Sequence, residues 1–177
     1  QALQISVANV DDNPVRVGNV LYVLVDRRSV FGNPFDMRGD EGNRNLVCNA
    51  FDNLTELHLQ GAGEIPDWLS SSGMEIQRRG AGFVRRLATP LARRQYMAGS
   101  DVVAREVVRD NMDVCLVCHC HPRRCHAISI GNHLRELIAS RTLRMSVESV
   151  TAEVRALVQV SAVDGYFCVA PRPGVDA

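Results

Sequence analysis

The stretch "MDVCLVCHCHPRRCH", residues 112–126, determines how the rest of the chain is arranged. Its first nine residues are mostly apolar but too few for an ordinary helix, so they predict a central strand buried on both faces. Pro122 ends the strand, because proline lacks a backbone donor and restricts the residue before it. The stretch is therefore expected to run from a strand through a short loop into a helix over residues 125–140.

Other segments continue this alternation of strands and helices. "LQISVANV" (3–10) and "VGNVLYVLV" (17–25) are β-branched runs separated by the turn-forming "DDNP", and "GYFCV" (165–169) also has strand composition. Apolar spacing predicts further helices over 44–59, over 100–110 with Ser100 or Asp101 as the cap, and over about 147–160. The predicted fold is α/β: a Rossmann-like three-layer sandwich with a mostly parallel sheet and an inserted segment.

The length of 177 residues fits a single domain spanning residues 1–177. We expect an arginine-rich insertion at about 60–100 and an added C-terminal helix and strand at about 145–170. Six arginines and no acidic residue occur between positions 78 and 94. This run predicts either a solvated helical surface or a contact with a protein partner or an anionic ligand.

Composition limits the classes of partner. The 20 basic residues, all arginine, equal the 20 acidic ones, which makes nucleic-acid binding unlikely as a dedicated function. No apolar stretch reaches about 18 residues, so no membrane span is expected. Four of the six cysteines crowd into residues 115–125, unlike a disulfide framework. We therefore expect a reducing compartment, such as the cytoplasm, with a virion as the alternative if the chain belongs to a viral assembly.

The cysteines and histidines of residues 118–126 allow three interpretations. Cys118 and Cys120 alternate onto one face, and Cys125 falls where free amides and the helix dipole favour a thiolate or an anion. Cys125 is then a candidate nucleophile, with His126 as its base and Cys120 beside it. Alternatively Cys118, Cys120, Cys125 and His126 hold zinc, although their spacing is cramped. In the third interpretation they are buried thiols and surface histidines without chemistry.

A second loop carries groups suited to an anion. "FGNPF" (31–35) brings the amide of Asn33, which follows Arg27 and Arg28 and precedes Arg44. Guanidinium groups bind phosphate and carboxylate oxygens in pairs. If the strand over 17–25 lies beside the strand over 112–120, both loops open onto one crevice at the carboxyl ends of the strands. Asn33, the three arginines and Cys118 are therefore the expected ligand-binding residues.

Both loops together resemble domain of unknown function 4326. The matching positions are Asn9, Tyr22, Gly32, Asn33, Pro34, Phe35 and Arg44, followed by Cys118, Cys120, Pro122, Cys125 and His126. The resemblance covers roughly residues 5–57 and 110–140. It implies a compact α/β domain in which both motifs meet in one pocket, and it ranks His119 and His121 below the motif cysteines and His126.

The expected function is a pocket for a phosphate-bearing small molecule or nucleotide derivative, with hydrolase or transferase chemistry based on cysteine and histidine. No P-loop and no kinase signature is present, so phosphoryl transfer from ATP is disfavoured. One alternative is a non-enzymatic structural or interaction component of a large assembly such as a capsid. The other is a small zinc-binding module; apart from zinc, no cofactor is expected.

Overall fold

The computed structural model describes residues 2–36, 40–60, 82–83, 90–144 and 151–175. Its strands are β1 (Ile5–Asn9), β2 (Val20–Leu24), β3 (Phe35–Asp36), β4 (Gly82–Phe83), β5 (Asp113–Cys118), β6 (Val158–Val163) and β7 (Tyr166–Pro171). Its α-helices are α1 (Arg44–Gln60), α3 (Pro90–Asp110), α4 (Ala127–Arg144) and α5 (Ala152–Leu157), with short 3-10 turns η1 (Val10–Asp12) and η2 (Glu41–Asn43). The mixture of strands and helices confirms the α/β class.

Strand β5 organises the sheet, as its sequence predicts. Five strands pair in the order β1-β5-β2-β7-β6, and β5 is parallel to both of its neighbours. Residues 114–118 are all buried, because both edges and both faces of the strand are covered. β7 also runs parallel to β2, and only β6 is antiparallel, paired with β7 over its whole length. The predicted mostly parallel sheet is therefore confirmed.

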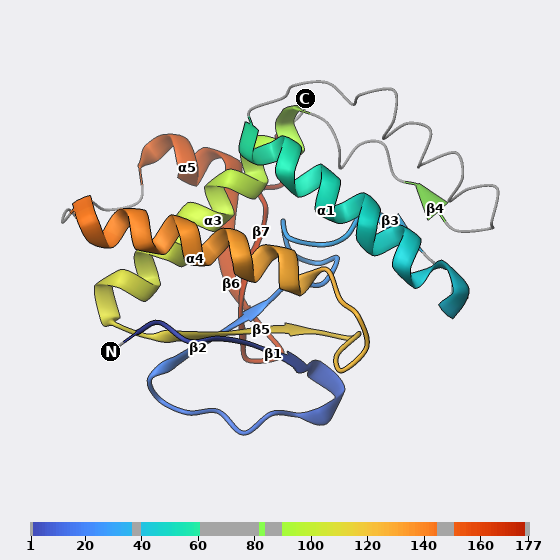
Figure 1. Cartoon of the computed structure of the whole chain (residues 1–177). Coiled ribbons are helices and arrows are strands. Elements are labelled where there is room, and N and C mark those ends of the chain that lie inside the picture. Colours follow the sequence, from blue (N-terminus) through green and yellow to red (C-terminus); the bar gives the residue numbers. More distant parts are fainter. Residues whose placement is uncertain (1, 37–39, 61–81, 84–89, 145–150, 176–177) are drawn as a thin grey trace.

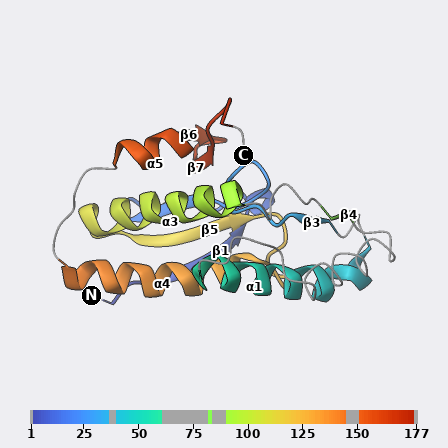
Figure 2. The same cartoon turned by 90° about the horizontal axis from the view of Figure 1, so that it is seen from above.

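The two faces of the sheet are covered differently. Apolar side chains on one face pack with α1, α3, α4 and α5 in a single core cluster. Figure 1 shows these helices on one side of the sheet, and Figure 2 shows them side by side, with α4 and α1 nearly end to end. The other face buries a smaller cluster that includes Leu24, Val117 and Tyr166. The segment between β1 and β2 crosses this second face, where Arg16 stacks 4.2 Å from the ring of Tyr166.

This arrangement does not confirm the predicted three-layer sandwich. In the described part of the chain, no α-helical residue belongs to the core cluster on the second face; the only helical residue packed against it is Val10 of the 3-10 turn η1. β1 and β2 are joined by residues 10–19, of which only η1 is helical, so this connection adds no helix layer. Tyr22 helps to hold the connection on the sheet, since its hydroxyl donates to the Val15 carbonyl (2.9 Å) and accepts from the Val17 amide (3.1 Å).

Helix α3 is longer than its sequence pattern predicts. The prediction placed its start at Ser100 or Asp101, but the helix begins at Pro90 and continues for 21 residues. Ser100 is fully buried in its middle, and its hydroxyl donates to the Tyr96 carbonyl one turn earlier (2.9 Å). The capping prediction is wrong because a serine hydroxyl can bond a carbonyl within a helix as well as an amide at its start.

The predicted helix over 147–160 is also wrong in extent. α5 covers only Ala152–Leu157, and Thr151 caps it by accepting a bond from the Val154 amide (3.3 Å). The following residues form β6, whose β-branched valines pair with β7 across the sheet. The spacing of these valines predicts one face of a helix, but pairing with β7 decides their conformation. Residues 145–150 lie outside the described residues.

Much of the predicted insertion lies outside the described residues as well. Arg78, Arg79, Arg85 and Arg86 fall there, while the half-buried Arg93 and the exposed Arg94 belong to α3. The hypothesis of a partner contact through residues 78–94 therefore stays a prediction. Within the described residues, no helix combines the length and apolarity needed to cross a membrane.

Candidate functional site

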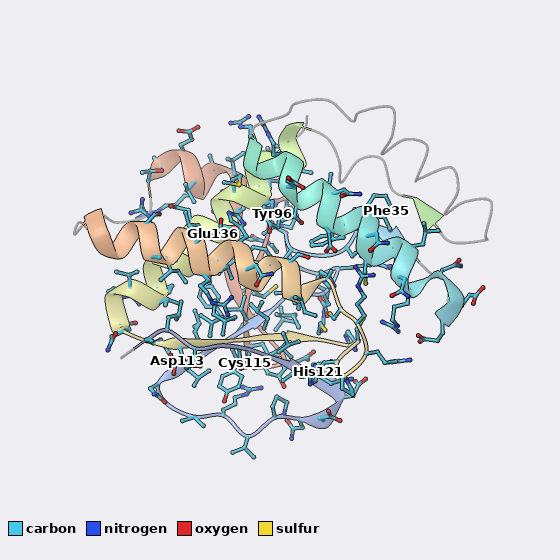
Figure 3. The ribbon with its side chains drawn as sticks, viewed as in Figure 1. Phe35, Tyr96, Asp113, Cys115, His121 and Glu136 are labelled. Atoms are coloured by element: carbon cyan, nitrogen blue, oxygen red, sulfur yellow. The ribbon has the colours of Figure 1, made fainter. Side chains whose placement is uncertain are left out.

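The carboxyl ends of β1, β5 and β2 meet at one edge of the sheet. Their registers place Asn9 beside Cys118 and Leu24 beside Val117. In Figure 3, His121 lies at this end of β5, whereas Asp113 lies at the opposite end. The Asn9 amide donates to the carbonyls of His119 (3.2 Å) and His121 (2.7 Å), so the end of β1 holds the cysteine loop in place.

A cavity of about 370 Å³ opens at this edge. A volume of this size is within the range of small-molecule sites. The residues lining the cavity come from the ends of β2 and β5, the Gly-Asn-Pro-Phe loop and the start of α1: Asp26, Arg27, Arg28, Asn33, Phe35, Arg44, Val47, Cys48, Cys118, His119, Cys120 and His126. All of the predicted ligand-binding residues are in this set. The two loops do open onto one crevice, because β2 lies beside β5.

Three thiols gather at the end of β5. The sulfurs of Cys118, Cys120 and Cys125 all lie within 4.8 Å of one another. The Cys118 and Cys125 sulfurs are 2.8 Å apart, longer than the roughly 2.05 Å of a disulfide, and all six cysteines are free. Two backbone amides point at these sulfurs, from Cys120 to Cys118 and from Ala127 to Cys125, each at 3.4 Å. Such N–H donors stabilise thiolates.

His126 is buried next to the thiols. Its Nε2 lies 2.7 Å from the Val25 carbonyl oxygen, which can only accept, so Nε2 carries the proton. Nδ1 then faces the Cys125 sulfur at 3.6 Å. Burial lowers the pKa of His126, which keeps the ring neutral. The ring is therefore fixed in one tautomer, with its lone pair directed at Cys125.

The three thiols differ in their affinity for protons. Hydrogen bonding with Cys118 and Cys125, assisted by Arg44, lowers the pKa of Cys120 well below that of a free thiol. Hydrogen bonding with Cys118 and Cys120, together with burial, raises the pKa of Cys125. Cys120 lines the cavity, whereas Cys125 is buried and is not among the lining residues. Cys118 and Cys120, rather than Cys125, are therefore the thiols of this group that a molecule in the cavity would meet, and the role of Cys125 as nucleophile stays a prediction.

Arg44 links the two loops from the first residue of α1. Its guanidinium makes two bonds to the Glu41 carboxylate (2.7 and 2.8 Å) and donates to the Arg124 carbonyl (3.0 Å). Hydrogen bonding to Glu41, with a further contribution from Cys120, raises the pKa of Arg44 and keeps it charged. A buried cation therefore lies beside Cys120.

Arg27 and Arg28 reach the cavity from the end of β2. Arg27 donates weakly to the Asn33 and Phe35 carbonyls (3.4 and 3.5 Å), so it stays near the Gly-Asn-Pro-Phe loop. Arg28 pairs with Asp26 at 2.7 Å, and this pairing lowers the pKa of Asp26 against the opposing effect of burial. His119 is also 3.3 Å from the Asp26 carboxylate. The carboxylate is thus neutralised by its neighbours inside the cavity.

The Asn33 side chain, which was expected to bind a ligand, instead makes most of its hydrogen bonds within the protein. Its side-chain oxygen accepts from the Phe35 amide (2.9 Å), and its nitrogen donates to the Val47 carbonyl in α1 (3.2 Å). These bonds fold the Gly-Asn-Pro-Phe loop onto α1. Asn33 therefore shapes the cavity wall, and at most one of its N–H groups is left for a ligand.

Sequence reasoning gave no role at the site to four residues that build it. Cys48 and Asp26 line the cavity, Asn9 anchors the cysteine loop, and the Val25 carbonyl fixes His126. Asp26 directly precedes the two arginines, and that adjacency was an available signal for an ion pair. Cys48 faces the cavity only because α1 packs there, and its position in a helical pattern does not indicate this.

Taken together, the fold and the site define an α/β domain in which cysteine and arginine side chains meet at the carboxyl edge of a mostly parallel sheet. A family model described as "Domain of unknown function (DUF4326)" matches residues 12–136, which is more than half of the chain. The protein therefore belongs to the DUF4326 family, and the resemblance seen in its two motifs is confirmed. Comparisons with curated proteins and with solved structures give no match.

Proposed function

We propose that this protein binds a small molecule carrying a phosphate group, of the nucleotide class, in the cavity at the ends of β2 and β5. The observation that carries the proposal is the convergence of Arg27, Arg28 and Arg44 on one cavity that is also lined by the thiols of Cys118 and Cys120. Arg28 is paired with Asp26 and Asp164 and Arg44 with Glu41, and all three guanidinium groups would bring positive charge to the bound anion. Guanidinium forks match phosphate oxygens geometrically as well as electrostatically.

Arg27→Gln is the variant that tests this pocket. We expect it to weaken the binding of adenosine monophosphate roughly tenfold or more, the effect of losing one charge-assisted hydrogen bond. Isothermal titration calorimetry measures the affinity, with adenosine as the uncharged comparison ligand. Arg27 is exposed, so the fold should tolerate the change.

Arg135→Gln provides the matched control, because it removes the same charge from the exposed side of α4, away from the cavity. Its affinity for adenosine monophosphate should equal that of the unaltered protein. Equal weakening by both variants, or equal binding of adenosine and its monophosphate, would contradict a phosphate-specific pocket.

The close approach of three thiols favours a second function, zinc binding by Cys118, Cys120 and Cys125. Two thiolates on a tetrahedral zinc ion stand roughly 3.8 Å apart, since each Zn–S bond is about 2.3 Å. All three sulfurs lie within 4.8 Å of one another, so small side-chain shifts would bring them to this spacing. The two backbone N–H groups that point at Cys118 and Cys125 support thiolates there.

Metal analysis of the purified chain tests the zinc proposal. We expect about one zinc per chain, and Cys120→Ser should lose most of it because one of three ligands is removed. Cys48→Ser is the matched control, since Cys48 lines the same cavity but does not belong to the group of three. Full zinc content in Cys120→Ser, or none in the unaltered protein after growth with zinc, would refute this site.

A further inference from the structure

The proposed metal site and the proposed ligand pocket share two residues. Cys118 and Cys120 belong to the group of three thiols and also line the cavity. Cys125 closes the group from the buried side, where its sulfur contacts Cys118 and faces His126. An ion held by the three sulfurs would therefore border the cavity on the side of Cys118 and Cys120.

The three thiols are one ligand short of a closed zinc site. Structural zinc sites use four protein ligands, whereas sites that act on a bound molecule keep one position for water or that molecule. Among the described side chains, the group within 4.8 Å contains three thiols and does not include His126. Nε2 of His126 donates to the Val25 carbonyl, so only Nδ1, 3.6 Å from the Cys125 sulfur, could bind a metal, and it lies outside the group of sulfurs within 4.8 Å of one another.

We infer that a metal ion bound by Cys118, Cys120 and Cys125 has its fourth coordination position open to the cavity, and that an anionic oxygen of the bound molecule fills it. This inference rests on the proposed function and specifies how the pocket recognises its ligand. Metal and arginine then hold the same phosphate group, and binding depends on the metal.

The groups around the site suit a phosphate monoester better than a neutral nucleoside. Zinc with three thiolates carries one net negative charge, and the Arg44 guanidinium, which also pairs with Glu41, lies next to Cys120. The other negative group in the cavity, Asp26, is paired with Arg28. A phosphate monoester can place one oxygen on the metal and another on Arg27, whereas a neutral nucleoside can do neither. The predicted ligand class is therefore a phosphate monoester.

Cobalt(II) in place of zinc makes the coordination visible. The full chain is loaded with Co²⁺, and its thiolate-to-metal absorption and visible bands are recorded. Azide, a small anion that enters open metal positions, should change the visible bands, and inorganic phosphate should reverse the change.

In calorimetry, metal-stripped protein should bind phosphate at least tenfold more weakly than zinc-loaded protein. Cys115→Ala, which removes a thiol from the cluster on the other face of the sheet, should behave like the unaltered chain, and circular dichroism checks that the stripped protein stays folded.

The possible outcomes distinguish failure of this inference from failure of the zinc site or the ligand pocket on which it rests. If azide leaves the cobalt bands unchanged and phosphate binds equally with and without metal, the site is closed and only this inference fails. Absence of thiolate-to-cobalt absorption would overturn both the metal site and this inference while leaving the arginine pocket intact. If phosphate and adenosine monophosphate bind in no state of the protein, the proposed function fails and this inference fails with it.

Discussion

Phe31→Ala should lower the free energy of unfolding by about 3–5 kcal/mol, the range for removing a large aromatic side chain from a core. Phe31 is fully buried, and its ring meets the Tyr96 ring edge-on with 5.6 Å between centroids. The alanine variant would leave a cavity between the loop after β2 and helix α3. Urea denaturation followed by circular dichroism measures the loss.

Val15→Ala is the control for this prediction. Val15 is 88% exposed on the connection between β1 and β2, so its truncation should change the free energy of unfolding by less than about 0.5 kcal/mol. A loss below about 1 kcal/mol for Phe31→Ala would show that the loop is not anchored in the core through this ring.

Gly32→Ala should disturb both stability and the site. An added Cβ would lie 2.6 Å from the Arg27 Cα and 2.9 Å from the Asp26 carbonyl oxygen, which are backbone atoms that cannot rotate away. The turn must open, at a cost of about 1–3 kcal/mol in the free energy of unfolding. Arg27 moves with the turn, so affinity for adenosine monophosphate should fall at least as far as in Arg27→Gln.

Gly18→Ala is the matched control, because no atom lies within 4 Å of its added Cβ. Its stability and affinity should stay close to those of the unaltered protein. If Gly32→Ala keeps both properties as well, the close contact in this turn does not constrain the cavity, and the account of the loop is wrong.

The sequence predicted the centre of this fold well and its margins less well. β5 was identifiable because an apolar run too short for a helix leaves few alternatives, and β1 and β2 have β-branched sequences bounded by turn residues. β6 and the start of α3 were misjudged. Valine spacing in β6 fits a helix and a strand alike, and pairing with β7 decides between them.

The sequence predicted which motif residues surround the candidate site, but not which role each of them has there. The motif residues of both loops do surround one cavity, because β2 lies next to β5 in a parallel sheet. That Cys120 rather than Cys125 borders the cavity depends on how the loop turns after β5. Asn9, which holds this loop through two carbonyls, precedes it by more than 100 residues.

By itself, the sequence determined which segments can be buried strands and helices, and which residue types could bind an anion or a metal. These properties follow from local periodicity and side-chain chemistry, which need no knowledge of neighbours. Only the tertiary structure decided that the helices pack on one face of the sheet, that β7 joins β2, and that Cys118 and Cys120 share a cavity with three arginines. Such juxtapositions depend on strand order and loop geometry, and these are set by packing between residues far apart in the chain.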